Sequence, residues 1–250
     1  MRRCPWGWWA VLLVAAACVF AFDAGISRWV RSDLALRGDI RREFETAQQY
    51  GQGGVILLVA VVIWLMDPGR RRWMLDYLAA IGLAGLVTIG IKVLVARPRP
   101  VLESAYGFLG PLRGWDFGDG VVAYSWQLGG DLTSKLWSMP SNHSAYAAIM
   151  SVFLAWHYPR LRWLVVVLAG IVGLGRVMVG AHYPSDVLVG WAVGWAMTWV
   201  ALRYALGVRG LDWIWTRLVD RSATPAYPGL VRAESARMAR ERACGCDSGG

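Results

Sequence analysis

Two of the three histidines in the chain lie beside residues that could make them reactive. His182 is followed four residues later by Asp186, about one helical turn away. A carboxylate in that place can accept a proton from one ring nitrogen and leave the other as a lone-pair nucleophile, which is the logic of catalytic triads. The structural alternative is that Asp186 stabilises a helix N-terminus and His182 is an interfacial ring.

The second histidine, His143, directly follows Pro140, Ser141 and Asn142. Proline and serine favour the start of a helix, whose free backbone N–H groups attract an anion, and the Ser141 hydroxyl would add a donor. This order of residues therefore indicates an anion site at a helix mouth. For Ser141 taken alone, an ordinary N-cap is the better explanation.

Basic residues gather near both histidine segments. Lys92 ends an apolar run and is followed by Arg97-Pro98-Arg99-Pro100, while Arg176 lies six residues before His182. Charged residues at membrane depth cost several kcal/mol on insertion scales, so each one needs a reason. When Lys92 and the arginines are considered alone, snorkelling of their heads to the interface is a sufficient reason.

Long apolar stretches must position these residues. The chain is 56% hydrophobic and 17% charged, with a mean hydropathy of +0.40, a composition typical of a membrane protein. A helix needs about 20 apolar residues to cross a bilayer, with roughly 17 tolerable. Six stretches meet or approach that length: Pro5–Phe22, Gly53–Met66, Tyr77–Val95, Ser144–Tyr158, Trp163–Val179 and Val187–Leu206. We therefore predict an all-α fold, a bundle of six transmembrane helices.

Six crossings would bring the chemical residues together. The Lys92–Pro100 bend and the two histidine segments fall on one membrane face, because even numbers of crossings separate them. Each cluster taken alone has a structural explanation, but three such explanations would have to hold independently on the same face. We therefore interpret the three clusters as one site. The third histidine, His157, falls on the opposite face beside Tyr158-Pro159, and we interpret it as structural.

The arginines predict the orientation of the bundle. The net charge is +9, but most arginines flank apolar runs, which indicates helix anchoring and excludes a nucleic-acid module. With six crossings, the N-terminus lies on the same side of the membrane as Arg70–Arg72, Arg160, Arg162 and the tail. Arginines are enriched in the cytoplasmic loops of membrane proteins, so we predict cytoplasmic termini and a site facing the periplasm or the cell exterior. Against this, Asp23–Tyr50 carries five arginines on the other face, balanced by five acidic residues.

We expect a membrane domain over residues 1–206, in which residues 77–206 carry the chemistry, and a polar, Arg-rich cytoplasmic tail over residues 207–250. The first stretch also resembles a signal peptide, but an uncleaved helix gives the even count of crossings that the charges favour. Between the third and fourth helices, the segment Val101–Met139 is an interfacial loop or helix, and it could equally be a lid over the site.

The cysteines show neither a disulfide framework nor the paired spacing of metal ligands. They are Cys4, Cys18, Cys244 and Cys246. Cys18 follows three alanines, which loosely resembles a lipoprotein cleavage site, but a plain helix is the better interpretation.

The three clusters together resemble the signature of the type-2 phosphatidic acid phosphatase superfamily, which also includes vanadium haloperoxidases and glucose-6-phosphatase. Its first motif, Lys, six residues, then Arg-Pro, is matched by Lys92, Arg99 and Pro100. Its second motif, Pro-Ser-Gly-His, is matched by Pro140, Ser141, Asn142 and His143. Its third motif, Ser-Arg, five residues, His, three residues, Asp, is matched by Gly175, Arg176, His182 and Asp186.

The resemblance extends from about Tyr77 to Leu206 and has two departures. Asn142 replaces a glycine, and because asparagine tolerates left-handed backbone, the amide toward phosphate can survive. Gly175 replaces a serine and removes a hydroxyl near Arg176. Arg97 is extra and lies outside the motif.

What the resemblance implies is a membrane phosphatase of the lipid branch that works without a metal or another cofactor. His182 would attack phosphorus and form a phosphohistidine, Asp186 would orient its ring, and His143 would protonate the leaving oxygen and then activate water. The phosphate oxygens would be bound by Lys92, Arg99, Ser141, the Asn142 backbone and Arg176.

The expected partners are the membrane and a phospholipid or isoprenoid lipid phosphate, and the expected location is a bacterial inner membrane. Undecaprenyl diphosphate, phosphatidic acid, phosphatidylglycerol phosphate and a lipid A phosphate would all present a similar phosphate. An outward-facing site favours the isoprenoid diphosphate by association only. Two alternatives stay open: a non-catalytic protein that binds or moves anionic lipid with the same cations, and a haloperoxidase, although haloperoxidases are soluble.

Overall fold

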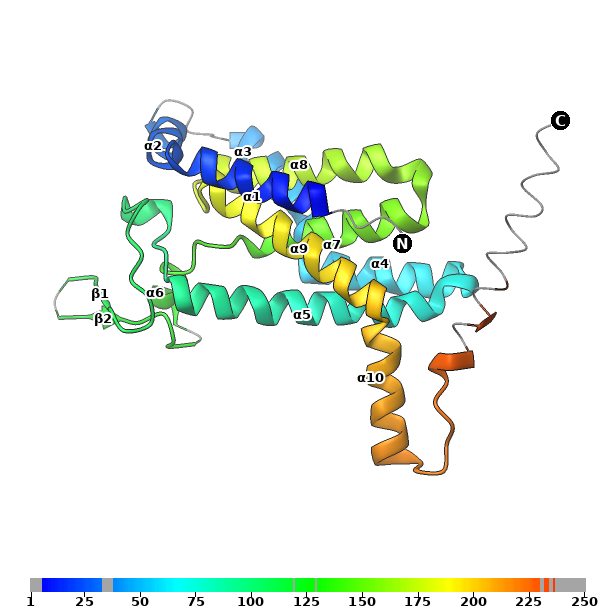
Figure 1. Ribbon diagram of the computed structural model, residues 1–250. Coiled ribbons are helices and arrows are strands. Elements are labelled where there is room, and N and C mark those ends of the chain that lie inside the picture. Colours follow the sequence, from blue (N-terminus) through cyan, green and yellow to red (C-terminus); the bar gives the residue numbers. More distant parts are fainter. Residues whose placement is uncertain are drawn as a thin grey trace.

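Helices occupy all six predicted apolar stretches in the computed structural model, which describes residues 6–32, 38–118, 120–128, 130–229, 232–233 and 236. These helices are α1 (Trp6–Phe20), α4 (Gly53–Met66), α5 (Arg71–Val95), α7 (Asn142–His157), α8 (Arg162–Met178) and α9 (Pro184–Tyr204). Figure 1 shows them running along the long axis of the molecule, with α5 below α7 and α9, and with α1 and α8 above. The prediction of a mostly helical fold is confirmed.

The number of membrane crossings stays a prediction. Three segments are long and apolar enough to cross alone: Pro68–Leu102, Pro159–Met178 and Pro184–Tyr204. Two bent pairs raise the number to as many as five: α1 meets α2 (Asp23–Ser32) at 68°, and the segment formed by α3 (Gly38–Ala47) and η1 (Gln48–Gly51) meets α4 at 53°. α7 has 16 residues. At 1.5 Å per residue it is about 24 Å long, less than the bilayer core of about 30 Å.

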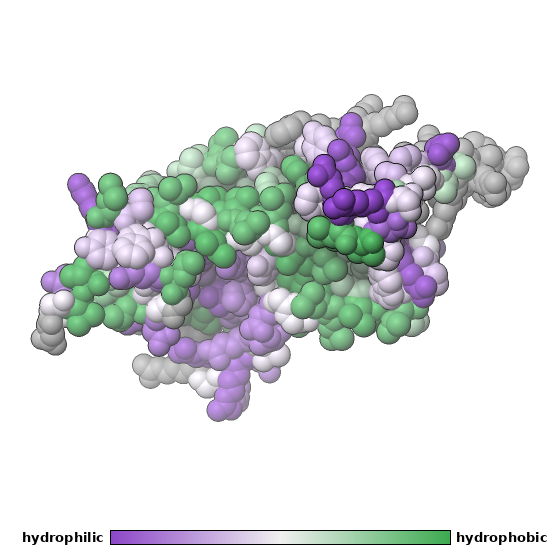
Figure 2. Space-filling view, turned by 90° about the horizontal axis from the view of Figure 1, so that it is seen from below, coloured by the Kyte–Doolittle hydropathy of each residue, from purple (hydrophilic) through white to green (hydrophobic). Residues whose placement is uncertain are grey.

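Hydrophobic side chains cover the outside of the bundle. Large side chains such as Leu58, Leu65, Leu86 and Val166 are exposed along α4, α5 and α8. Figure 2 shows hydrophobic residues spread over much of the face seen from below, with hydrophilic residues in the lower middle and towards both ends of the view. An apolar surface this extensive would be unstable in water and is expected of helices that face lipid.

The core of the bundle is packed between α4, α5, α7 and α9. Tyr77 of α5 and Phe153 of α7 are fully buried, with ring centroids 4.7 Å apart. The third histidine, His157, packs beside this pair: its ring lies 4.5 Å from the ring of Phe153 and 5.0 Å from that of Trp73, measured between centroids. Its packing against two aromatic rings agrees with a structural role.

Small residues let α7 and α9 approach closely. A Cβ added at Gly194 would lie 2.1 Å from the backbone oxygen of Ala145, and one added at Gly190 would lie 2.6 Å from the backbone oxygen of Ser141. Backbone atoms cannot move aside as a flexible side chain can. The two helices therefore cross at a distance that only glycine permits, which is common between membrane helices.

The segment between α5 and α7 folds onto the C-terminal end of α5. It contains η3 (Pro100–Leu102), the antiparallel strands β1 (Trp115–Asp116) and β2 (Val122–Ala123), and α6 (Asp131–Ser134). Ser125 Oγ donates to the Val93 carbonyl at 2.8 Å, and the Trp137 indole N–H donates to the Ser125 carbonyl at 2.9 Å. These bonds fix the segment at one end of the bundle, beside α2 in Figure 1; its role as a lid stays a prediction.

After α9 the chain turns sharply into α10 (Leu206–Ile214), which leaves the bundle at an angle (Figure 1). The buried Asp76 side chain accepts the Gly207 N–H at 2.9 Å and thereby caps this helix. The short π-helix η5 (Trp215–Val219) follows. Cys18 is exposed and unpaired, whereas Cys4, Cys244, Cys246 and the end of the predicted tail lie outside the described residues.

The close approach of α7 and α9 predicts that one added methyl group destabilises the protein. Gly194→Ala should lower the stability of the protein by about 1–3 kcal/mol, because the new Cβ meets backbone and the helices must separate. The measurement is thermal unfolding of the purified protein in detergent. Gly82→Ala is the matched control, since a Cβ at Gly82 of α5 contacts nothing within 4 Å. Equal melting temperatures for the two variants would contradict the prediction.

Candidate active site

The three predicted clusters converge at one end of the bundle. Lys92 lies in the last turn of α5, His143 in the first turn of α7, and His182 in the connection between α8 and α9. The charges of Arg176, Arg99 and Lys92 all act on His143, and those of Arg99 and Arg176 act on Lys92. The sequence-predicted residues therefore form one cationic site rather than three separate helix ends.

Ser141 has the N-cap role that the sequence favoured for it, and its role as an anion donor stays a prediction. It is the N-cap of α7, where its Oγ accepts the Ser144 N–H at 3.4 Å and lies 3.0 Å from Ser144 Oγ. A serine hydroxyl carries one proton of its own, so Ser141 can still donate to an anion if Ser144 Oγ donates to it.

Asn142 is the first residue of α7 and does not adopt a left-handed backbone. The reasoning that asparagine substitutes for glycine through left-handed tolerance is therefore wrong for this chain. The Asn142 amide belongs to the N–H groups at the start of a helix that have no partner within the helix. It is available to an anion for that reason.

His182 is held in one tautomer by a backbone group. Its Nδ1 lies 2.6 Å from the carbonyl oxygen of Ser138, the residue that precedes the Met139-Pro140 peptide. A carbonyl can only accept, so Nδ1 carries the proton and Nε2 keeps its lone pair. The ring is 3% exposed, and this burial lowers the pKa of His182 to about 3. The imidazole is therefore neutral at physiological pH, as a nucleophile requires.

Asp186 reaches His182 through Ser138 rather than directly. The Asp186 Oδ2 atom is 3.8 Å from His182 Nδ1, longer than a hydrogen bond. Oδ2 instead accepts the Ser138 hydroxyl at 2.5 Å and the Tyr183 N–H at 2.9 Å. The carboxylate thus fixes both chain segments on either side of the ring, and Ser138 supplies the atom that orients it.

Arg97, which the motif analysis set aside as extra, is the centre of a buried network. It is fully buried, and its Nη1 donates to Asp186 Oδ1 at 2.6 Å. Its Nη2 donates to Asp23 Oδ2 at 2.7 Å, and its Nε and Nη2 donate to the Ala105 carbonyl at 2.9 and 2.7 Å. The Tyr183 ring lies 4.2 Å from the guanidinium carbon. Arg97 therefore joins the predicted catalytic carboxylate to the N-terminal helices.

Asp23 completes this network from the first residue of α2. It is fully buried and also accepts the N–H of Ser185 at 3.1 Å and the Ser185 hydroxyl. Two signals in the sequence could have revealed the pair: a second arginine in Arg97-Pro98-Arg99, and an acidic residue directly after an apolar run. The partners are 74 residues apart, so no local pattern connects them.

Arg99 and Arg176 keep donors free within the site. The Nε of each is buried and has no hydrogen-bond partner among the described residues. Arg176 Nη1 donates to Gln48 Oε1 at 2.7 Å, which fixes the direction of its guanidinium. Buried N–H groups without partners are costly, and a phosphate between the two arginines would satisfy them.

Gln48 also explains the departure at Gly175. A Cβ added at Gly175 would lie 3.1 Å from Gln48 Cγ, so glycine leaves the space that this buried side chain occupies. Where the superfamily motif has a serine beside the arginine, this chain brings an amide from η1 to the same arginine. Gln48 is a second contributor that the motif analysis missed.

The Arg97 network predicts a large and specific loss of stability. Arg97→Met should cost about 3–5 kcal/mol, because Asp23 and Asp186 would be left buried without a counter-charge. Arg28→Met, on the exposed face of α2, is the control and should change stability little. The measurement is thermal unfolding in detergent.

A double substitution separates this charge effect from lost packing. Asp23→Asn should destabilise the wild-type protein but should restore part of the stability of Arg97→Met, because it removes one of the two unpaired carboxylates. Strictly additive effects would contradict a charge network.

Comparison with known proteins identifies the family of this chain. Residues 73–209 match the PAP2 superfamily. The chain is 26% identical over 200 residues to a protein named lipid A 1-phosphatase from Rhizobium etli, covering 75% of this chain and 81% of that one. It is 27% identical over 132 residues to the undecaprenyl-diphosphatase BcrC of Bacillus subtilis, covering 52% and 58%.

Two solved structures have the same fold. LpxE of Aquifex aeolicus superposes with a TM-score of 0.52 at 19% identity, over 73% of this chain and 96% of that one. The phosphatidylglycerolphosphate phosphatase of Bacillus subtilis, described as transmembrane and of PAP2 type, superposes with a TM-score of 0.54 at 22% identity, over 80% and 93%. The family match spans more than half of the chain and includes all three motifs, so the chain belongs to the PAP2 superfamily of membrane phosphatases.

Proposed function

We propose that this protein hydrolyses a lipid phosphate, a phosphomonoester or a diphosphate, through a phosphohistidine formed on His182. The observation that carries the proposal is the hydrogen bond between His182 Nδ1 and the Ser138 carbonyl. It leaves Nε2 as an unprotonated nucleophile in a site where Arg99 and Arg176 have free donors. A neutral nucleophile beside unsatisfied cations is the arrangement that phosphoryl transfer to histidine needs.

In the first step, His182 Nε2 attacks phosphorus while the bond from phosphorus to the lipid oxygen breaks. His143 gives a proton to that oxygen, and the lipid leaves as an alcohol or as a lipid monophosphate. The cations of Lys92, Arg99 and Arg176 stabilise the charge on the equatorial oxygens, the task that Mg²⁺ performs in many other phosphoryl transferases. The Ser141 hydroxyl and the Asn142 N–H add two further donors.

In the second step, His143 takes a proton from a water molecule, whose oxygen attacks the phosphohistidine. The bond between phosphorus and Nε2 breaks, orthophosphate leaves, and His182 returns to its neutral form. The Ser138 carbonyl and Asp186 stay in place throughout. Asp186 supports the positive charge that develops on the ring from 3.8 Å, and its bond from the Ser138 hydroxyl holds the residue whose carbonyl accepts from the ring.

The substrate proposal rests on the predicted outward-facing topology and on the names of the relatives. Lipid A and undecaprenyl diphosphate both expose their phosphates at a membrane surface, and relatives of this chain are named for each. We place the site at the periplasmic or outer face of a bacterial inner membrane, with both termini in the cytoplasm. The lipid reaches the site from the membrane, through the end of the bundle where the cations gather.

Removal of the nucleophile tests the proposal. His182→Ala should reduce phosphate release from a panel of lipid phosphates on the order of 10⁴-fold or more, since loss of a covalent nucleophile leaves only binding and electrostatics. The panel contains an isoprenyl diphosphate, phosphatidic acid, phosphatidylglycerol phosphate and a lipid A phosphate. His157→Phe is the matched control, because it removes a histidine from the same bundle but keeps the ring contacts with Phe153 and Trp73.

Assays of the wild-type protein distinguish an enzyme from a non-catalytic lipid-binding protein. Phosphate release that continues in EDTA and stops with vanadate supports the proposal, while binding of the same lipids without release supports a non-catalytic lipid-binding protein. Retained turnover in a folded His182→Ala protein would refute the assignment of the nucleophile.

Two substrates with different leaving groups test the role of His143. His143→Gln should slow hydrolysis of an alkyl phosphate far more than the first step with p-nitrophenyl phosphate, whose leaving group needs no proton. Because His143 also activates water, p-nitrophenol should appear in a burst equal to the enzyme concentration and then slowly. The measurement is stopped-flow absorbance. Equal losses for both substrates, without a burst, would contradict the acid–base role.

A further inference from the structure

Helix α10 carries an exposed apolar face at the end of the bundle opposite the candidate active site. Its first turn is tightly packed: Val208 is buried, and a Cβ added at Gly207 would overlap the Leu75 carbonyl of α5. Leu211 and Ile214 follow on the same side of the helix, at spacings of three, four and seven residues, and they are 47% and 46% exposed. The face that packs on α5 at its start therefore continues outward as an exposed apolar surface.

The opposite face of α10 is covered by the chain itself. Arg209 and Asp212 are three residues apart and share this face. Asp212 accepts the N–H groups of Ala226 at 3.1 Å and of Tyr227 at 2.7 Å, and the guanidinium carbon of Arg209 lies 5.8 Å from the centre of the Tyr227 ring. The chain after η5 thus folds back onto the polar face and leaves the apolar face open.

The start of α10 lies near a surface of the bilayer. Asp76, which caps α10 through the Gly207 N–H, is sixteen residues before Lys92 on α5. This separation is about 24 Å along a helix, close to the roughly 30 Å thickness of the bilayer core. Figure 1 shows α10 running across the long axis of the bundle rather than along it. Because the spanning helices cross the bilayer along this axis, α10 runs along the membrane surface.

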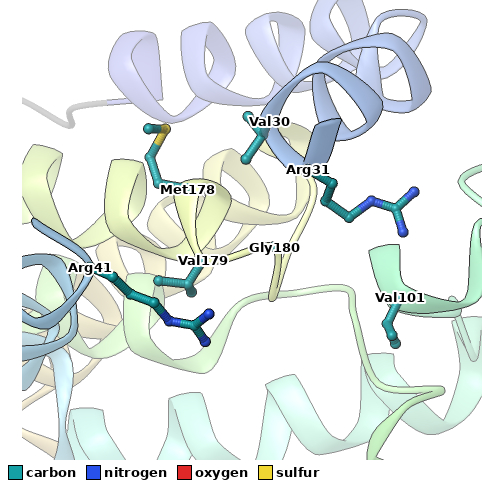
Figure 3. Close-up of a pocket in the computed structure, with 7 residues that line it drawn as sticks. All are labelled: Val30, Arg31, Arg41, Val101, Met178, Val179 and Gly180. Carbon is teal, nitrogen blue, oxygen red and sulfur yellow. The ribbon is translucent and has the colours of Figure 1, made fainter. Parts of the chain in front are cut away.

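Arginines at the end that carries the candidate active site are paired with acidic residues. Figure 3 shows Arg31 and Arg41 on either side of the Val179–Gly180 turn, at a cavity of about 290 Å³. Arg31 Nη2 lies 3.1 Å from a Glu103 carboxylate oxygen, and Arg41 Nε lies 2.8 Å from one of Glu45. These two charges are therefore balanced within the protein.

The arginines that flank α10 have no such partners. Arg203 and Arg217 are exposed and form no ion pair with any residue that the structure describes. Two exposed tryptophans, Trp213 and Trp215, lie between them, and tryptophan is enriched at the level of the lipid headgroups. Cations beside an apolar helix face match a bilayer surface that contains anionic lipid.

We propose that α10 and η5 bind the membrane surface on the face opposite the candidate active site. The apolar face lies at the boundary between headgroups and acyl chains, where the exposed Leu218 and Val219 of η5 extend it, and Arg203 and Arg217 bind anionic phospholipid headgroups. The membrane is the occupant because the apolar face is continuous with the outside of α5, where Leu78 is already exposed to lipid. This attachment does not depend on the proposed phosphatase function.

The test places a spin label on each face of α10 in the full-length protein, with the four native cysteines replaced by serine. Leu211→Cys reports on the apolar face, and Arg209→Cys is the matched control, an exposed position of the same helix on the polar face. The protein is reconstituted into vesicles of phosphatidylcholine and phosphatidylglycerol. The measurement is the ratio of label collisions with oxygen, which dissolves among acyl chains, to collisions with a water-soluble nickel chelate.

This ratio should be several-fold higher at Leu211→Cys than at Arg209→Cys. Equal ratios at the two positions would overturn the proposal, because both faces would then meet water. Few collisions with either reagent at Leu211→Cys would also overturn it, because the face would then be covered by protein, such as a second copy of this chain.

The lipid charge gives a second readout. In vesicles of phosphatidylcholine alone, the ratio at Leu211→Cys should be lower, and Arg203→Gln combined with Arg217→Gln should abolish the difference between the two kinds of vesicle. Arg28→Gln combined with Arg42→Gln is the matched control and should keep the difference, since these exposed arginines lie on α2 and α3. A ratio that does not respond to phosphatidylglycerol in the protein with all its arginines would overturn the binding of anionic headgroups.

Discussion

The structure of the site depends on a carboxylate that is buried at the end of a membrane bundle. Asp186 is inaccessible to solvent, and a charge in that place must be paired and hydrogen-bonded to be stable. Its donors come from three parts of the chain: Arg97 after α5, the Ser138 hydroxyl before α7, and the Tyr183 N–H at the start of α9. Each of these segments must be in its place for the carboxylate to be satisfied, so the need to solvate one charge assembles the site.

Close helix packing supplies the rest of the geometry. Because Gly190 and Gly194 let α9 lie against the backbone of α7, the Ser141 N–H can donate to the Asp186 carbonyl at 3.1 Å. The start of α7, which carries His143, and the first turn of α9, which carries Asp186, are thereby joined by a backbone bond. His143 lies on α7, and His182, in the connection before α9, is fixed by its bond to the Ser138 carbonyl, so the two rings are held relative to each other as the proposed reaction requires.

Local patterns in the sequence predicted the helices and the motif residues, but they did not reveal contacts between residues that are far apart along the chain. Apolar stretches located the helices, and the motif spacing located the residues that the structure brings together. The role of Arg97 was missed because its partner Asp23 belongs to another helix, and the contribution of Gln48 was missed because it reaches Arg176 from 128 residues away. The expected bond from His182 to Asp186 was replaced by one to Ser138, since the Ser138 carbonyl lies closer and the carboxylate has other donors.

These long-range contacts divide the molecule by function. The segment that matches the superfamily supplies the histidines and the cations, while the helices before it touch the site at three points: Asp23 on Arg97, Gln48 on Arg176, and Arg31 beside Gly180. The first contact holds Arg97, which pairs with Asp186, and the second holds Arg176, which we propose binds the reacting phosphate, so the proposed chemistry depends on both. The third holds none of those groups. The proposed chemistry therefore rests on the first two contacts, and the N-terminal helices serve it by holding Arg97 and Arg176 in place.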